Sequence, residues 1–364
     1  MLLRSGIIAA GSVKPTLVST LDNSIYKSTV YLKFDAQYGY FGHGTRFTIF
    51  DPVAMSVVAE VNDSTHLSSV SCVELSADGN YIFLACEQNA SVTVYNISTK
   101  SSPTFVQQFK GPTPNTSLNG VSFIKRSGNT LFATTLSRNS VALIDCTDPT
   151  NLAWISEFRG PTPGTSLKSC RRCDIDPVNN ILYYVCDDTS AGTHRFGAAD
   201  ISTPASPVEL WSISNDDVFS SRGVYYVASR NLVFVNATLN TPFLGAVTAY
   251  DVSNPLVTPA KVGQAVGFGT ATSVTSLEAT RSTAFITKGS KIYAAVVAET
   301  PDNISLFDWT DAANPVRIGG VKSTTNLNSP LDIQIGPDGY AYAGNFASNS
   351  LSVEGVSKWN LNLP

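Results

Sequence analysis

A motif that recurs at intervals of about fifty residues constrains the fold of this chain more than any other feature. Residues 109–118 contain FKGPTP followed by TSL, and residues 158–167 contain FRGPTP followed by TSL. Looser copies occupy residues 64–67 and 323–327. The apolar residue of this loop marks seven units along the chain: Ile25, Leu67, Leu118, Leu167, Phe219, Leu277 and Leu327.

Each unit carries four short stretches with the pattern of β-strands. In the second unit, residues 70–75 alternate, Asp78 and Gly79 form a turn, and residues 81–86 are an apolar run. Two further strand-like stretches follow at residues 91–95 and 104–109. No window of a dozen residues has a convincing 3.6-residue period. Seven such units predict an all-β fold, a seven-bladed β-propeller of four-stranded antiparallel blades.

We expect one domain over residues 1–364. Residues 1–14 form an N-terminal extension, and residues 15–20 are a closing strand in the last blade. Residues 350–353 are read as the third strand of that blade and residues 358–361 as a weak outermost strand. Closure of this kind removes open sheet edges. The expected blades span about 21–61, 62–111, 112–160, 161–214, 215–266, 267–321 and 322–364.

Two recurring segments resemble known propeller repeats. Residues 248–263 and 306–320 place an Asp, an Asn-Pro pair and a strand ending in Gly in the same order, which resembles the LVIVD repeat. The hairpins at residues 76–81 and 336–340 are similar to the YVTN-type propeller hairpin. The resemblance spans nearly the whole chain. It implies the propeller fold, but such propellers occur in surface, adhesive and enzymatic proteins alike.

An aspartate recurs at the end of the third strand of each of five units. A short acceptor at this place can bind the backbone N–H groups that follow it. Because catalytic sites do not come in five symmetric copies, we predict a structural role for these residues. They are Asp51, Asp145, Asp200, Asp251 and Asp308.

One face of a propeller gathers the loops between blades and the loops between second and third strands, and ligands usually enter there. The inter-blade loops supply a mixed polar set, suited to hydrogen bonding with sugars or polar peptides: Lys27, Asn119, Lys168, Arg222, Glu278 and Asn328. Two longer loops, 187–197 and 236–245, add Asp187, His194 and the apolar Phe243 as candidate ligand contacts. A solvated funnel without a ligand is the alternative.

The sequence gives weaker support for a metal site or a redox site. His43, His66 and His194 could ligate a metal only if they converged, and their spacing does not require it. Cys170 and Cys173 fall within a strand pattern, unlike the helix-opening position of redox pairs. We expect six buried thiols, with Cys72 and Cys86 facing each other across a hairpin. No cofactor, metal site or catalytic residue is predicted.

Composition narrows the classes of partner. The net charge is −4 and only 14% of residues are charged, which argues against nucleic acid, because phosphate binding needs a concentrated basic face. No apolar run is long enough to span a membrane, and the apolar stretch after Arg4 is too short for a secretory signal. The low charge and many Ser, Thr and Asn residues favour a protein carried at a virion or extracellular surface.

These observations favour a non-enzymatic recognition or assembly module that binds a glycan or a protein partner, either alone or as a subunit of a larger assembly. The rival is a lactonase or cyclo-isomerase acting at the central channel, for which Lys168, Arg222 and Glu278 are the only obvious acid and base groups. A plain scaffold with a protein-binding rim is a third reading.

Overall fold

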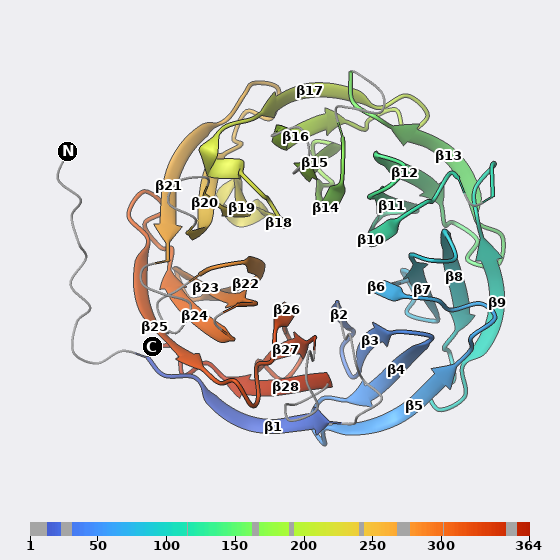
Figure 1. The fold of residues 1–364 in the computed structure, drawn as a ribbon, viewed down its shortest axis with the longest axis horizontal. Coiled ribbons are helices and arrows are strands. Elements are labelled where there is room, and N and C mark those ends of the chain that lie inside the picture. The colour runs from blue at the N-terminus through green and yellow to red at the C-terminus, as the bar shows by residue number, and fades with distance from the viewer. Residues whose placement is uncertain are drawn as a thin grey trace.

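The computed structural model describes residues 13–22, 31–114, 116–161, 167–188, 193–239, 244–267, 277–300, 302–346 and 355–364. These residues form seven four-stranded antiparallel sheets arranged as blades around a central channel, with the first strand of each blade innermost (Figure 1). The predicted all-β, seven-bladed propeller is therefore confirmed.

Blades 1 to 6 each use four consecutive strands. Blades 1 to 3 comprise β2 (Leu32–Phe34), β3 (Gly39–His43), β4 (Arg46–Asp51) and β5 (Ser56–Asn62); β6 (Val70–Leu75), β7 (Tyr81–Cys86), β8 (Ser91–Asn96) and β9 (Thr104–Phe109); and β10 (Val121–Ser127), β11 (Thr130–Thr135), β12 (Ser140–Asp145) and β13 (Ala153–Phe158).

Blades 4 to 6 comprise β14 (Cys170–Asp176), β15 (Ile181–Asp188), β16 (Thr193–Asp200) and β17 (Val208–Ile213); β18 (Gly223–Val227), β19 (Leu232–Thr238), β20 (Gly245–Asp251) and β21 (Ala260–Val266); and β22 (Thr280–Lys288), β23 (Lys291–Ala298), β24 (Asn303–Asp308) and β25 (Val316–Lys322). Two 3₁₀ turns, η1 (Asp216–Val218) and η2 (Ala228–Arg230), belong to blade 5.

Blade 7 joins the two ends of the chain. Its strands are β26 (Pro330–Ile335), β27 (Ala341–Asn345), β28 (Gly355–Asn360) and, outermost, β1 (Thr16–Asp22). Thr16 lies opposite Asn360 in this antiparallel pair. The predicted closing strand is confirmed, but the assignment of residues 358–361 to an outermost strand is wrong. That stretch belongs to the third strand, because the N-terminus already supplies the fourth.

The chain also contacts blade 6 before it enters blade 7. The Val13 N–H donates to the Ile318 carbonyl (2.8 Å), and the Gly320 N–H donates to the Val13 carbonyl (3.1 Å). A side chain at Gly319 would place its Cβ 1.7 Å from the Val13 carbonyl oxygen, so only glycine fits there. Residues 1–12 of the expected extension and residues 350–353 lie outside the described residues.

The hydrophobic core is distributed between neighbouring blades. Each of six buried clusters contains side chains from two or three adjacent blades, and together they connect every blade to the next around the ring. For example, the ring centroids of Phe50 in blade 1 and Tyr342 in blade 7 lie 6.1 Å apart. Each such large apolar side chain stabilises the ring by roughly 1.5–3 kcal/mol through burial.

The recurring aspartates have the predicted structural role. Each accepts a hydrogen bond from the backbone N–H two residues later, and the same position in the remaining two blades is an asparagine that does likewise. The seven acceptors are Asp51, Asn96, Asp145, Asp200, Asp251, Asp308 and Asn360, at 2.7–2.9 Å. One side chain thus fixes the turn after the third strand in every blade.

Candidate functional site

A β-bulge near the start of the first strand recurs in five blades. The pairing with the second strand skips one residue in blades 2, 3, 4, 6 and 7. A bulge leaves its extra residue unpaired and changes the direction of that side chain. The skipped residues are Ser71, Ser122, Arg171, Arg281 and Leu331, and all five line one cavity at the mouth of the central channel.

This cavity, here called the mouth cavity, has a volume of about 590 Å³. All seven blades, or the loops that enter them, contribute to its wall. The lining residues are Tyr31, Gly44, Thr45, Ser68, Ser69, Val70, Ser71, Glu87, Gln88, Ser122, Leu136, Arg171, Arg222, Arg281, Leu331 and Phe346. The volume falls within the range of small-molecule sites, about 300–1,000 Å³.

The mouth cavity is polarised. Consecutive blades 4, 5 and 6 supply Arg171, Arg222 and Arg281, whereas blades 2 and 3 supply hydroxyl, amide and carboxyl groups. Figure 1 shows that these two sets of blades occupy different sectors of the ring. A ligand in the cavity would therefore meet cationic groups on one side and neutral hydrogen-bonding groups together with Glu87 on another.

Two carboxylates hold the arginines from behind. Asp187 is fully buried, and its Oδ2 lies 3.0 Å from Nη2 of Arg222 and 3.4 Å from Nη2 of Arg171. The Nε of Arg281 donates to Glu299 Oε2 (2.6 Å). Neither Asp187 nor Glu299 is among the lining residues.

The pKa of Arg222 depends on its burial and on the charges of this cluster. Burial and the neighbouring charge of Arg171 lower this pKa to about 10, although Asp187 acts in the opposite direction. On the other side of the mouth cavity, burial raises the pKa of Glu87, and Arg171 partly offsets that effect.

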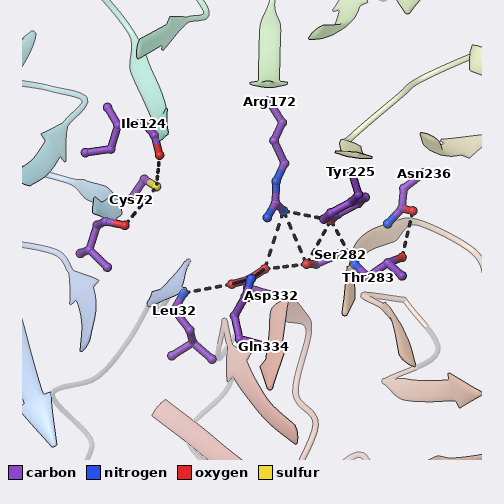
Figure 2. Close-up of polar contacts among 11 residues, drawn as sticks. Leu32, Cys72, Ile124, Arg172, Tyr225, Asn236, Ser282, Thr283, Asp332 and Gln334 are labelled. Atoms are coloured by element: carbon purple, nitrogen blue, oxygen red, sulfur yellow. Dashed lines mark hydrogen bonds and ion pairs between the residues drawn. The ribbon is translucent and has the colours of Figure 1, made fainter. Parts of the chain in front are cut away.

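Next to the residues that line the mouth cavity, buried polar side chains of the innermost strands form a network, here called the floor (Figure 2). Nη1 of Arg172 donates to the Tyr225 hydroxyl (3.0 Å) and lies 3.7 Å from Oδ1 of Asp332. Ser282 Oγ donates to the same Asp332 oxygen (2.5 Å), and the Leu32 N–H donates to Asp332 Oδ2 (3.0 Å). This network links blades 1, 4, 5, 6 and 7.

Aromatic rings complete the floor. The Arg172 guanidinium lies 4.6–5.0 Å from the ring centroids of Tyr31, Phe123 and Tyr225. Burial raises the pKa of Asp332, against the opposing effect of Arg172. A second cavity of about 350 Å³, lined by residues further along the same first strands, lies beyond the floor.

The structure brings together some of the predicted ligand residues. Arg222 lines the mouth cavity. Asp187 and His194 are buried directly behind it, facing each other across β15 and β16, with His194 Nδ1 3.2 Å from Asp187 Oδ1. Both were expected in a loop, but the two strands extend as far as Asp188 and Thr193, and part of the segment 236–245 likewise belongs to β19 and β20.

The other predicted ligand residues are placed differently. Asn119 is exposed, Asn328 is buried, and Lys168 and Glu278 are half-buried. None of these four is among the described residues that line the mouth cavity. Lys27 and Phe243 lie outside the described residues. The ligand role of these residues stays a prediction.

Sequence reasoning did not identify Arg171, Arg281 or the Arg172–Asp332 pair. Alternation within a strand does not reveal a bulge, so the direction of residues 171 and 281 was hidden. One signal was available in the sequence: Arg171 and Arg281 each occupy the second position of the first strand, the position that carries the bulge in five repeats. A second signal was a charged residue inside a first strand whose neighbours are buried.

The histidines contact neighbouring polar side chains. His43 Nε2 lies 3.2 Å from Thr48 Oγ1, and His66 Nδ1 lies 2.7 Å from Asp63. In the part of the chain that the structure describes, no group of three His, Cys, Asp or Glu residues is placed to bind a metal ion.

The six cysteines are buried and unbonded to one another. The expected facing of Cys72 and Cys86 is wrong, because the hairpin turn places Leu75 opposite Ile82 and the unbroken register from there places Cys72 opposite Ala85. Cys170 and Cys186 instead lie opposite each other.

The ring of seven sheets and its channel define the chain as a seven-bladed β-propeller. No family model and no curated protein matches the sequence, so the LVIVD and YVTN resemblance remains a resemblance. Among the described residues, no helix has the length and apolar character needed to span a membrane.

Solved structures share the fold. Hydrazine synthase of Kuenenia stuttgartiensis is 15% identical, with a TM-score of 0.67 over 91% of this chain and 96% of that one. The Cps50 (Swd1) β-propeller domain of Myceliophteria thermophila is 12% identical, with a TM-score of 0.65 over 95% and 99%. The periplasmic gluconolactonase PpgL of Pseudomonas aeruginosa is 16% identical, with a TM-score of 0.63 over 84% and 87%. At these identities the likeness establishes the fold alone.

Proposed function

We propose that this protein is a recognition or assembly module that binds a glycan or a protein partner in the mouth cavity, at a virion or extracellular surface. The observation that carries the proposal is a floored cavity of about 590 Å³ to which all seven blades contribute. Its wall is fixed by strands rather than by loops alone, so the groups that contact a partner are held in place before binding. Such preorganisation lowers the entropic cost of association.

The polar wall supports recognition by hydrogen bonding. Ser71 and Ser122 point into the mouth cavity from bulges, and Ser68 donates to Gln88 (3.0 Å), which fixes the amide of Gln88 at the wall. Hydroxyl and amide groups can both donate and accept hydrogen bonds, as the hydroxyls of a sugar do.

The test is binding of the labelled protein to a glycan array and to surface proteins of the host or particle. A Ser122→Trp variant fills the mouth cavity, and Ser101→Trp, an exposed position in the turn between β8 and β9, is the matched control. We expect the first variant to lose binding and the second to retain it, with both variants showing the wild-type unfolding temperature. Binding that survives Ser122→Trp would place the recognition surface elsewhere.

A second candidate function is hydrolysis of a sugar lactone in the same cavity. It is favoured by Glu87, which lines the cavity and has a raised pKa, and by the structural likeness to a gluconolactonase. In this scheme the Glu87 carboxylate takes a proton from water, the water oxygen adds to the lactone carbonyl, and the ring C–O bond breaks as its oxygen takes up a proton.

Lactone hydrolysis measured by proton release distinguishes the two functions. Turnover by the wild type that falls at least a hundredfold in Glu87→Gln, and persists in Glu60→Gln on the outer strand β5, would support the enzyme. An equal rate in all three proteins would exclude it.

A further inference from the structure

We propose that the mouth cavity binds a sugar acid, with the ligand carboxylate held by Arg171, Arg222 and Arg281 and the ligand hydroxyls by the side chains of blades 2 and 3. This inference names the ligand class and rests on the recognition role proposed above.

The first argument is the number and geometry of the cationic groups. Three guanidinium groups line one cavity, and their side chains are 25–32% exposed. Each guanidinium has five N–H donors in a fork that matches a carboxylate. Asp187 offers the same oxygen to Arg171 and Arg222, and Glu299 offers one oxygen to Arg281. Each guanidinium therefore keeps N–H groups that neither Asp187 nor Glu299 uses.

The second argument is the charge balance. Two carboxylates hold three arginines, and the third nearby carboxylate, Glu87, lies on the wall formed by blade 2. Burial first, and the repulsion of Arg171 and Arg281 second, lower the pKa of Arg222, and the buried Asp187 does not fully offset them. A bound carboxylate next to Arg222 would relieve this repulsion.

The third argument distinguishes a sugar acid from a simple anion. Glu87 accepts hydrogen bonds from hydroxyl groups, which a sugar acid offers and acetate does not. Ser71, Ser122 and Gln88 add further hydrogen-bonding groups on the same side. Phe346, a 37% exposed aromatic side chain at the cavity wall, offers an apolar surface for the C–H face of a sugar ring. A molecule that carries both a carboxylate and several hydroxyls uses all of these groups.

The test is isothermal titration calorimetry with glucuronate and galacturonate. Methyl glucoside, methyl galactoside, acetate and phosphate serve as the comparison ligands. We expect at least one uronate to bind at least tenfold more tightly than its neutral glycoside and than either simple anion. The uronate affinity should fall as salt rises, because the contact is ionic.

Variants locate the carboxylate. Arg281→Gln combined with Glu299→Gln removes one cationic group without changing the net charge, and Arg222→Lys keeps the charge but loses the fork. We expect each to weaken uronate binding at least tenfold. Arg138→Gln combined with Glu157→Gln removes an ion pair outside the cavity and should leave the affinity unchanged. Thermal unfolding confirms that each variant is folded.

The outcomes separate the two proposals. Equal affinity for uronate and neutral glycoside, or acetate and phosphate binding as tightly as uronate, would overturn the sugar-acid inference and leave cavity recognition standing. Uronate binding that is unaffected by both arginine variants would also overturn it. Absence of uronate binding, together with a partner whose binding survives Ser122→Trp, would overturn the recognition role as well.

Discussion

The guanidinium of Arg222 in blade 5 lies 3.0 Å from the buried carboxylate of Asp187 in blade 4, and of this pair Arg222 lines the mouth cavity while Asp187 lies behind it. Arg171 and the Nδ1 atom of His194 lie within 3.4 Å of the same carboxylate. The ion pair therefore couples the stability of the ring to the position of the arginines that line the mouth cavity.

Replacement of this carboxylate should destabilise the protein. Asp187→Asn leaves Arg171 and Arg222 without their counter-charge, and we expect a loss of about 2–3 kcal/mol in the free energy of unfolding, since both arginines are partly exposed. Glu157→Gln is the matched control, because Glu157 lies on the outer strand β13 and pairs there with two arginines, Arg138 and Arg159. It should cost under about 1 kcal/mol. Equal losses in urea unfolding would contradict the assignment.

The free energy of unfolding should fall in acid because Asp63 becomes protonated. Although partial burial alone would raise its pKa, hydrogen bonds from Tyr95, from the His66 side chain and from backbone N–H groups lower it from 3.8 to about 2. Because the folded pKa is the lower one, this stabilisation is complete above pH 3.8 and is lost as the pH falls toward 2. Urea unfolding at pH 5.0 and pH 2.5 measures the loss. Asp63→Asn should show a smaller difference between the two, and an unchanged difference would rule out this role.

The turn acceptor of blade 7 should behave like those of the other blades. Asn360→Ala removes the hydrogen bond to the Asn362 N–H, and we expect a loss of about 0.5–1.5 kcal/mol. Asn360→Asp restores the acceptor found in five other blades and should recover most of that loss. Thermal unfolding of the two variants tests the point. If aspartate is no better than alanine, the turn in blade 7 is held by other contacts.

Removal of β1 should open the ring. A chain without residues 1–22 leaves the edge of β28 unpaired, and exposed strand edges promote aggregation. A chain without residues 1–12 keeps both Val13 and β1 and is the control. We expect the shorter chain to unfold at least 10 °C lower and to form oligomers on size-exclusion chromatography. Identical behaviour of the two chains would show that β1 is dispensable.

The fold was largely predictable because each repeat carries its own local signals. Alternation, Asp-Gly turns and the Asp after the third strand recur in register, so they identify the blades without tertiary information. The error in blade 7 arose because Asn360 was not aligned with Asp251 and Asp308. Asn360 accepts a hydrogen bond from the backbone N–H two residues later, as Asp251 and Asp308 do at the ends of their third strands. The strand that ends at Asn360 is therefore the third strand of blade 7.

The site was less predictable because it depends on contacts between repeats. Arg222 was identified from its loop, but Arg171 and Arg281 face the cavity only because a bulge precedes the regular pairing. Arg172 and Asp332 are distant in sequence and meet only when the ring is closed. Cys72 and Cys86 failed to face each other for a local reason, since the hairpin turn pairs Leu75 with Ile82 and so places Cys72 opposite Ala85.

A crystal structure of the protein soaked with the uronate that binds most tightly tests the central claim most directly. The account predicts density for the sugar in the mouth cavity, with its carboxylate within hydrogen-bond distance of Arg222 and of Arg171 or Arg281. Density with the carboxylate directed toward solvent, or a sugar bound outside this cavity, would contradict it.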